Sequence, residues 1–186
     1  MSTSVGGRGA GSGDREADVE ADPESVARTI VLRQLTMTAR TRSELASTLA
    51  KREVPVDVAN RVLDRMSEVG LIDDAAYAQE WVRQRQQGRG LARRALANEL
   101  RRKGVDDELA LEALAQVSDD TERASAFALA ERKARASRGQ PHDKRVRQLV
   151  GMLARKGYGS GVAFSVVREV LTSEGVAAAA ELELPD

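Results

Sequence analysis

Residues 96–114 read LANELRRKGVDDELALEAL, and this stretch decides the fold because its apolar spacing occurs three times along the chain. The apolar positions follow one another at intervals of four, five, four and five residues. They are Leu96, Leu100, Val105, Leu109 and Leu114 in this copy, Leu45, Leu49, Val54, Val58 and Leu63 before it, and Leu149, Leu153, Tyr158, Val162 and Val167 after it. The three sets begin 51 and then 53 residues apart. Such a repeat predicts a modular array, which supplies a binding surface more often than a catalytic pocket.

Each copy is predicted to contain three helices, because apolar residues recur at helical spacing between turn residues. In the first copy we expect helices over about 25–38, 43–52 and 55–69, with Ser43 as the cap of the second. In the second copy, Gly104 is well placed as a left-handed stop for the helix before it. The predicted fold is therefore an all-α, elongated and curved array of three tandem three-helix repeats.

The first helix of the third copy is aligned through Ala124, Phe127 and Ala128, which repeat the spacing of Ala78, Trp81 and Val82. This alignment leaves seven extra residues before the next helix, and we expect them to form a loop within 137–143. The predicted layout is a disordered, acidic, Gly-rich N-terminus at 1–24, repeats at 25–70, 71–117 and 118–174, and a flexible acidic tail at 175–186.

The charge is unevenly distributed although 29 basic and 29 acidic residues give no net charge. Residues 1–24 hold two bases and six acids, and residues 175–186 hold three acids and no base. The segment between them keeps 27 bases against 20 acids, a net charge of +7. A basic body between acidic ends points to an acidic or polyanionic partner such as nucleic acid.

Two basic segments, 83–103 and 132–156, are the main candidates for a binding surface, since each contains a single acid. Arginine suits phosphate and carboxylate groups because it binds them with two parallel hydrogen bonds. The alternative is an ordinary solvated face. The residues that we predict to contact a partner or DNA are Arg83, Arg85, Arg89, Arg93, Arg94, Arg101, Arg102 and Lys103, with Arg145, Arg147 and Lys156 as a second patch.

The aromatic residues are predicted to pack in the core rather than to stack on bases. Trp81 and Tyr77 share one helical face, and Tyr158 occupies an apolar column of the repeat. Apolar residues at helical spacing usually indicate burial.

Catalytic, cofactor and metal sites are not predicted. The chain has no Cys, and its one histidine, His142, is expected in a polar loop without partners for a metal or a triad. Gly88 and Gly90 follow a helix and are read as a turn rather than a nucleotide-binding loop. No apolar run approaches the ~18 residues of a membrane span, and the N-terminus lacks the apolar core of a signal peptide. We therefore expect a non-enzymatic, monomeric protein of the cytoplasm that needs no cofactor.

The middle copy carries a motif that resembles one family. It consists of Gly70-Leu71-Ile72-Asp73-Asp74, Tyr77-Ala78, Trp81, Arg85, Gly90 and Glu99-Leu100-x-x-Lys103-Gly104-Val105. Over about residues 26–171 the chain resembles the RecX family of recombinase regulators, with an actinobacterial character in its acidic N-terminus. The first copy departs from the pattern, since Arg52-Glu53 stands where the others have Lys-Gly.

The resemblance implies a protein that binds the RecA filament along its helical groove and blocks or reverses filament growth. Members of the family thereby restrain strand exchange and coprotease activity in homologous recombination, DNA repair and the SOS response, and many also bind DNA. The residues of the basic patches are assigned from charge rather than from the motif.

Two other classes of protein fit the sequence. One is a DNA-binding protein that clamps phosphates with its basic helices, although no helix presents the Asn, Gln and Arg pattern that reads base edges. The other is a helical scaffold for a different acidic protein.

Overall fold

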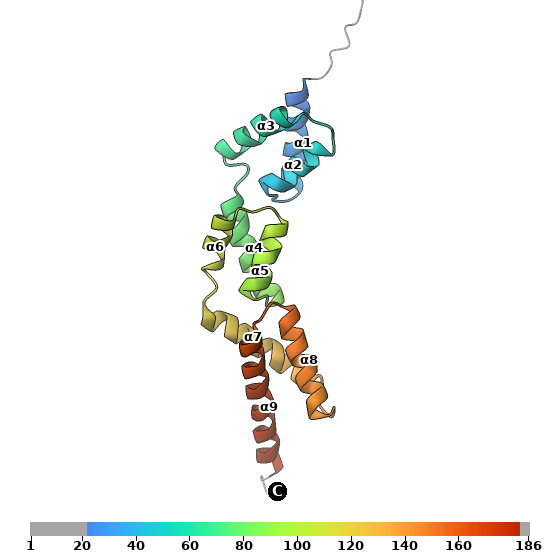
Figure 1. The fold of residues 1–186 in the computed structure, drawn as a ribbon, viewed down its shortest axis with the longest axis vertical. Coiled ribbons are helices and arrows are strands. Elements are labelled where there is room, and N and C mark those ends of the chain that lie inside the picture. The colour runs from blue at the N-terminus through green and yellow to red at the C-terminus, as the bar shows by residue number, and fades with distance from the viewer. Residues whose placement is uncertain (1–21, 183–186) are drawn as a thin grey trace, which may run out of the picture.

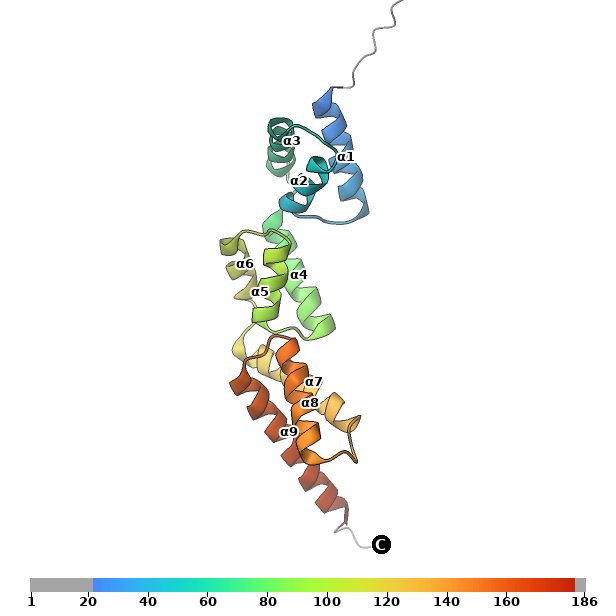
Figure 2. The same cartoon turned by 45° about the vertical axis from the view of Figure 1, so that its right-hand side comes forward.

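The computed structural model describes the backbone of residues 22–182 and the side chains of residues 22–175. Within residues 22–182 it contains nine helices and no strand, so the predicted all-α class is confirmed. The helices form three units that follow one another along a single long axis (Figures 1 and 2). No helix in this range is long and apolar enough to cross a membrane.

Each unit contains three consecutive helices. Repeat 1 consists of α1 (Pro23–Met37), α2 (Arg42–Ala50) and α3 (Val56–Glu68). Repeat 2 consists of α4 (Asp74–Arg89), α5 (Arg93–Arg102) and α6 (Asp107–Leu114). Repeat 3 consists of α7 (Asp119–Arg135), α8 (His142–Arg155) and α9 (Ser160–Leu182).

The columns of the sequence repeat form the cores of these units. Two leucines of each second helix are fully buried, namely Leu45 and Leu49, Leu96 and Leu100, and Leu149 and Leu153. The buried side chains fall into three separate clusters, and the main helix–helix contacts lie within one repeat. Neighbouring repeats are therefore joined by local contacts instead of a continuous core.

The helix caps explain most of the boundaries. The side chains of Asp73 and Asp106 cap α4 and α6, because each accepts a hydrogen bond from an exposed backbone N–H of the first turn. The prediction of Ser43 as the cap of α2 is wrong. Thr41 fills that position and forms a reciprocal capping box with Glu44, which satisfies two backbone donors.

The alignment of α7 is also wrong. Ala124 and Ala128 are exposed, whereas Ala126 and Ala130 are fully buried. Ala126 and Ala130 thus take the places of Ala27 and Val31 in repeat 1 and of Ala78 and Val82 in repeat 2. The second member of each pair precedes the first leucine of the next helix by 14 residues in repeats 1 and 2 and by 19 in repeat 3. The connection is thus five residues longer, and not seven. Alanine carries too weak an apolar signal to fix the register of a helix that contains it on every face.

The chain ends differ from the predicted layout where the structure describes them. Asp22 caps α1, which begins at Pro23, so the last residues of the predicted N-terminal segment are helical. Residues 1–21 and 183–186 lie outside the described residues. α9 continues to Leu182, well past the boundary predicted at 174, so residues 175–182 are helical. His142 is the first residue of α8 rather than part of a loop.

Candidate partner-binding surface

The Lys-Gly turn of the family motif joins one repeat to the next. In repeat 2 this turn, Lys103-Gly104, lies against the start of α2, and we call the contact junction 1. In repeat 3 the turn Lys156-Gly157 lies against the start of α5, and we call this contact junction 2. Both glycines have positive φ, +71° at Gly104 and +93° at Gly157, and neither site has space for a Cβ atom. Glycine is therefore required for conformation and for close approach.

Junction 1 combines a backbone contact with an ion pair. The Thr41 hydroxyl donates to the carbonyl oxygen of Lys103 at 2.6 Å, and the Lys103 ammonium donates to Glu44 at 2.7 Å. The backbone N–H of Arg42 donates to the Asp74 carboxylate at the start of the next repeat, at 2.9 Å. The hydrogen bond that Lys103 donates to Glu44 raises the pKa of Lys103, because it stabilises the charged ammonium.

An aromatic cluster supports junction 1 from repeat 2. The rings of Tyr77 and Trp81 stack with centroids 5.7 Å apart, and the Trp81 indole N–H donates to Glu99 at 2.9 Å. The Arg85 guanidinium and the Lys103 ammonium lie over the Trp81 ring, 4.1 and 4.8 Å from its centroid. Both rings pack on the core of repeat 2, as predicted. They are only half-buried, however, so part of each ring remains exposed.

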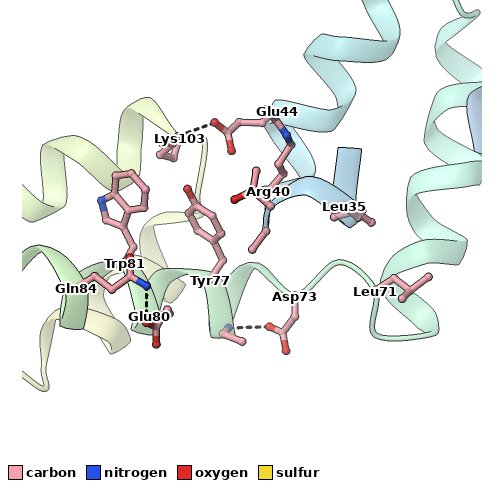
Figure 3. A pocket seen from close by; sticks show the side chains of 13 residues that line it. Leu35, Arg40, Glu44, Leu71, Asp73, Tyr77, Glu80, Trp81, Gln84 and Lys103 are labelled. Atoms are coloured by element: carbon pink, nitrogen blue, oxygen red, sulfur yellow. Dashed lines mark hydrogen bonds and ion pairs between the residues drawn. The ribbon is translucent and has the colours of Figure 1, made fainter. Parts of the chain in front are cut away.

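The other side of this cluster lines a groove of about 530 Å³ between repeats 1 and 2 (Figure 3). Leu35 of α1 and Leu71, which lies between α3 and α4, are at the end of the groove away from Trp81. The Arg40 Nε atom is buried and has no hydrogen-bond partner among the described residues. Nowhere in residues 22–175 do three or more His, Cys, Asp or Glu side chains gather as a metal site.

Junction 2 uses backbone groups in place of the ion pair. The N–H of Ala92 donates to the carbonyl oxygen of Lys156 at 3.0 Å, and the Tyr158 hydroxyl donates to the carbonyl oxygen of Gly90 at 3.0 Å. The Lys156 ammonium donates to the carbonyl oxygen of Arg89. Burial raises the pKa of Tyr158 to about 12. Burial lowers the pKa of Lys156, and the nearby charges of Arg132 and Arg89 act in the same direction.

Carboxylates of α7 complete junction 2. The backbone N–H and the side chain of Arg93 donate to Glu122, at 3.1 and 2.9 Å, and the guanidinium also pairs with Asp119. Arg93 follows Arg42 by one repeat of 51 residues. A carboxylate from the first turn of the following repeat thus accepts the same backbone N–H at both junctions.

Five of the eleven predicted contact residues bind groups on other elements of the molecule. Lys103, Lys156 and Arg93 bind at the junctions, and Arg85 pairs with Glu99 at 3.3 Å. Arg145 is only 15% exposed and pairs with Glu174, and this contact lowers the pKa of the Glu174 carboxyl. Each of these five residues joins two helices or two repeats. Its positive charge is partly neutralised by a carboxylate or partly buried.

Arg83, Arg89, Arg94, Arg101, Arg102 and Arg147, the other six predicted residues, are exposed. Arg83 pairs with Glu80 on its own helix. Arg94, Arg101 and Arg102 lie on the side of α5 that faces away from its buried leucines.

The outer side of α8 is also basic. Lys144, Arg147 and Arg155 are exposed there, opposite the buried leucines of that helix. We call the six residues Arg94, Arg101, Arg102, Lys144, Arg147 and Arg155 the basic face. The helices α5 and α8 that carry it follow one another along the long axis (Figures 1 and 2).

The sequence analysis did not identify four residues that join neighbouring repeats. Thr41 and Glu44 bind Lys103, whereas the carboxylates of Asp74 and Glu122 accept backbone N–H groups of the preceding repeat. A signal existed for the first two, since Thr41-x-x-Glu44 has the spacing of a capping box. No local pattern shows that the same side chains also bind a residue about 60 positions away.

Comparison with known families gives a match in each repeat. The family model described as RecX, first three-helix domain, matches residues 27–66. The models for the second and third three-helix domains of RecX match residues 73–114 and 120–167. Together the three models cover most of the chain.

Curated relatives match over nearly their full length. The regulatory protein RecX of Streptomyces coelicolor is 52% identical over 170 residues, which is 91% of this chain and 90% of that protein. The regulatory protein RecX of Thermobifida fusca is 50% identical over 159 residues, which is 84% of this chain and 86% of that protein.

Solved structures share the fold. The crystal structure of RecX from Lactobacillus salivarius superposes with a TM-score of 0.73 at 23% identity, over 81% of this chain and 97% of that one. A crystal structure of regulatory protein RecX gives a TM-score of 0.71 at 27% identity, over 80% of this chain and 73% of that one.

Proposed function

The chain belongs to the RecX family of regulatory proteins, and we propose that it binds RecA filaments on DNA and inhibits their extension, strand exchange and coprotease activity. Membership of the family supports a regulator of RecA. The proposal places the protein in the cytoplasm with RecA and has it act as a monomer, without a cofactor and without enzymatic activity of its own.

The observation that carries the proposal is the basic face. Its cations occur on the second helices of two successive repeats, α5 and α8, and junction 2 holds the start of α5 against the end of α8. A nucleoprotein filament presents acidic groups and phosphates at regular intervals, so successive repeats can contact successive sites. Each such contact contributes about 0.5–2 kcal/mol, and contacts on one rigid chain add through effective concentration.

The same face supports a second candidate, a DNA-binding protein without sequence specificity. Exposed arginines on the outer sides of α5 and α8 suit phosphate contacts, which need no base-reading side chains. Such a protein would mask single-stranded DNA instead of acting on the filament.

Titration of the protein into RecA filaments distinguishes the two candidates. ATP hydrolysis by RecA on single-stranded DNA is measured while the protein is added far below the RecA concentration. We expect hydrolysis to fall at these low ratios, because a bound regulator stops growth of a whole filament. A fall that begins only when the protein covers the DNA would favour the DNA-binding candidate.

A charge-reversed variant tests the basic face. R94E/R101E/R102E is expected to need at least tenfold more protein for half-maximal inhibition. Arg93 is left unchanged because it binds across junction 2. The matched control is R33E/R61E/R65E, which makes the same charge change on exposed residues of repeat 1 and should stay within twofold of the parent. Equal inhibition by the two variants would contradict the assignment.

A further inference from the structure

A second surface, distinct from the basic face, lies between α8 and α9. It is a groove of about 690 Å³ with Val146, Val167 and Leu171 along it. Phe164 stands beside it, and 55% of this residue is exposed. Large aromatic side chains are seldom left this exposed without a partner, because their burial is strongly favourable.

The charged rim of this groove is cationic. Arg168 and His142 line it, and the lining contains no carboxylate. The two acids within residues 160–175 of α9 are engaged elsewhere, since Glu169 pairs with Arg123 and Glu174 with Arg138 and Arg145. Arg168 has no ion-pair partner within the described residues. The groove therefore offers apolar surface next to a cation with unused hydrogen-bond donors.

Repeat 2 provides a natural comparison for Phe164. Leu111 precedes Phe164 by one repeat of 53 residues and is 68% exposed. The exposed acids Asp107, Glu108 and Glu112 surround Leu111 in the sequence of α6, which has no exposed base. Equivalent positions thus expose a large apolar side chain in opposite electrostatic settings.

We propose that the groove between α8 and α9 binds an acidic amphipathic segment of a partner protein. An apolar side chain of that segment packs beside Phe164, and a neighbouring carboxylate binds Arg168. Charge complementarity argues for this partner, because the lining of the groove contains the cation of Arg168 and no carboxylate. The partner is taken to be the filament protein, so this inference rests on the proposed function.

α8 can serve both surfaces at once. His142 and Val146 are on the side of α8 that lines the groove, whereas Lys144 and Arg147 belong to the exposed basic face. The basic face remains available for phosphates while the groove binds protein.

Two variants and a matched control test the groove. F164S removes the exposed aromatic ring, and R168E reverses the rim charge. Both changes are on the surface, so the helix content and thermal midpoint should match those of the parent. We expect each variant to need at least tenfold more protein to inhibit RecA ATP hydrolysis, while its affinity for single-stranded DNA alone stays within twofold. L111S removes an equally exposed side chain from the acidic setting and should inhibit like the parent.

The inference is overturned if the parent inhibits and F164S and R168E inhibit equally well, whereas the proposed function itself fails if the parent does not inhibit. A photo-crosslinking residue placed at position 164 of the full chain gives a readout that does not depend on inhibition. Crosslinking to an acidic, apolar segment of RecA in the filament supports the inference. Crosslinking to DNA, to α6 of a second copy of this chain or to no partner overturns it.

Discussion

Junction 1 and junction 2 use the same backbone scheme with different side-chain chemistry. In both, a glycine in the left-handed region lets the turn approach the start of a second helix, and the carbonyl oxygen of a lysine accepts a hydrogen bond. At junction 1 the lysine ammonium binds a carboxylate, and at junction 2 it binds a backbone carbonyl. The contact with Glu44 raises the pKa of Lys103, whereas burial and the charges of Arg132 and Arg89 lower the pKa of Lys156.

The comparison shows what the Lys-Gly motif does. Its glycine and its backbone are the parts that both junctions use in the same way, and its lysine side chain adapts to each setting. Repeat 1 has no preceding repeat within the described residues, and its equivalent turn carries Arg52-Glu53. Glu53 still adopts a φ of 60°, so this turn keeps the left-handed shape although it carries a side chain that the close approach at the two junctions would forbid.

The largest expected effect comes from adding a methyl group at the two glycines. In G157A the new Cβ would lie 2.7 Å from the backbone nitrogen of Ala95, so the free energy of unfolding should fall by about 3 kcal/mol or more. In G104A it would meet the side chain of Ser43, at 2.2 Å from Oγ, and a loss of about 2 kcal/mol is expected. Urea denaturation measures both.

A double substitution separates the two causes of the lost stability in G104A, which are the clash with Ser43 and the left-handed strain. S43G/G104A removes the clash but keeps the left-handed strain, so it should recover roughly half of the loss after correction for S43G alone. A95G/G157A should recover less, because the backbone nitrogen of residue 95 remains in place. Equal recovery at both junctions would contradict the distinction.

Alkaline pH should weaken junction 2 through Tyr158. Because burial raises the pKa of this hydroxyl from about 10 to about 12, its contribution to stability is complete below pH 10 and is lost as the pH rises toward 12. Between pH 9 and 11 the parent should lose about 1 kcal/mol more than Y158F. Urea denaturation across this range measures the free energy of unfolding of both proteins. A difference that stays constant with pH would show that folding does not raise the pKa of Tyr158.

Removal of each lysine ammonium sharpens the contrast between the junctions. K103M leaves Glu44 without its partner and should cost about 1 kcal/mol, whereas K156M also relieves repulsion from Arg89 and Arg132 and should cost less than about 0.5 kcal/mol. Trp81 is the only tryptophan and lies against Lys103, so its fluorescence should change in K103M alone. A larger loss of stability in K156M than in K103M would contradict this prediction.

The smallest expected effect has the opposite sign. E53G replaces a left-handed non-glycine residue, and the relief of strain should exceed the entropy cost of glycine by about 0.5 kcal/mol. Thermal denaturation should therefore give a slightly higher midpoint. E53A keeps the strain and serves as the control.

The sequence predicted the fold well where the side chains are large. The leucines at 45, 96 and 149 fix the three cores, and Asp73 and Asp106 mark helix starts by ordinary capping. Prediction was poorer where the residues are small or long. The alanines of α7 gave the wrong register, and the charged side chains of the basic segments divided between internal pairs and solvent in a way that no local pattern encodes.

The sequence by itself determined the helical class, the number of repeats and the family, because apolar periodicity and a motif with fixed spacing are properties of the linear chain. The tertiary structure alone decided that Lys103 and Arg93 bind neighbouring repeats while Arg94 and Arg101 face solvent. An arginine or lysine has the same charge in either place. Only the position of Glu44 or Glu122, brought close by folding across tens of residues, distinguishes a joint of the array from a surface that can bind a partner.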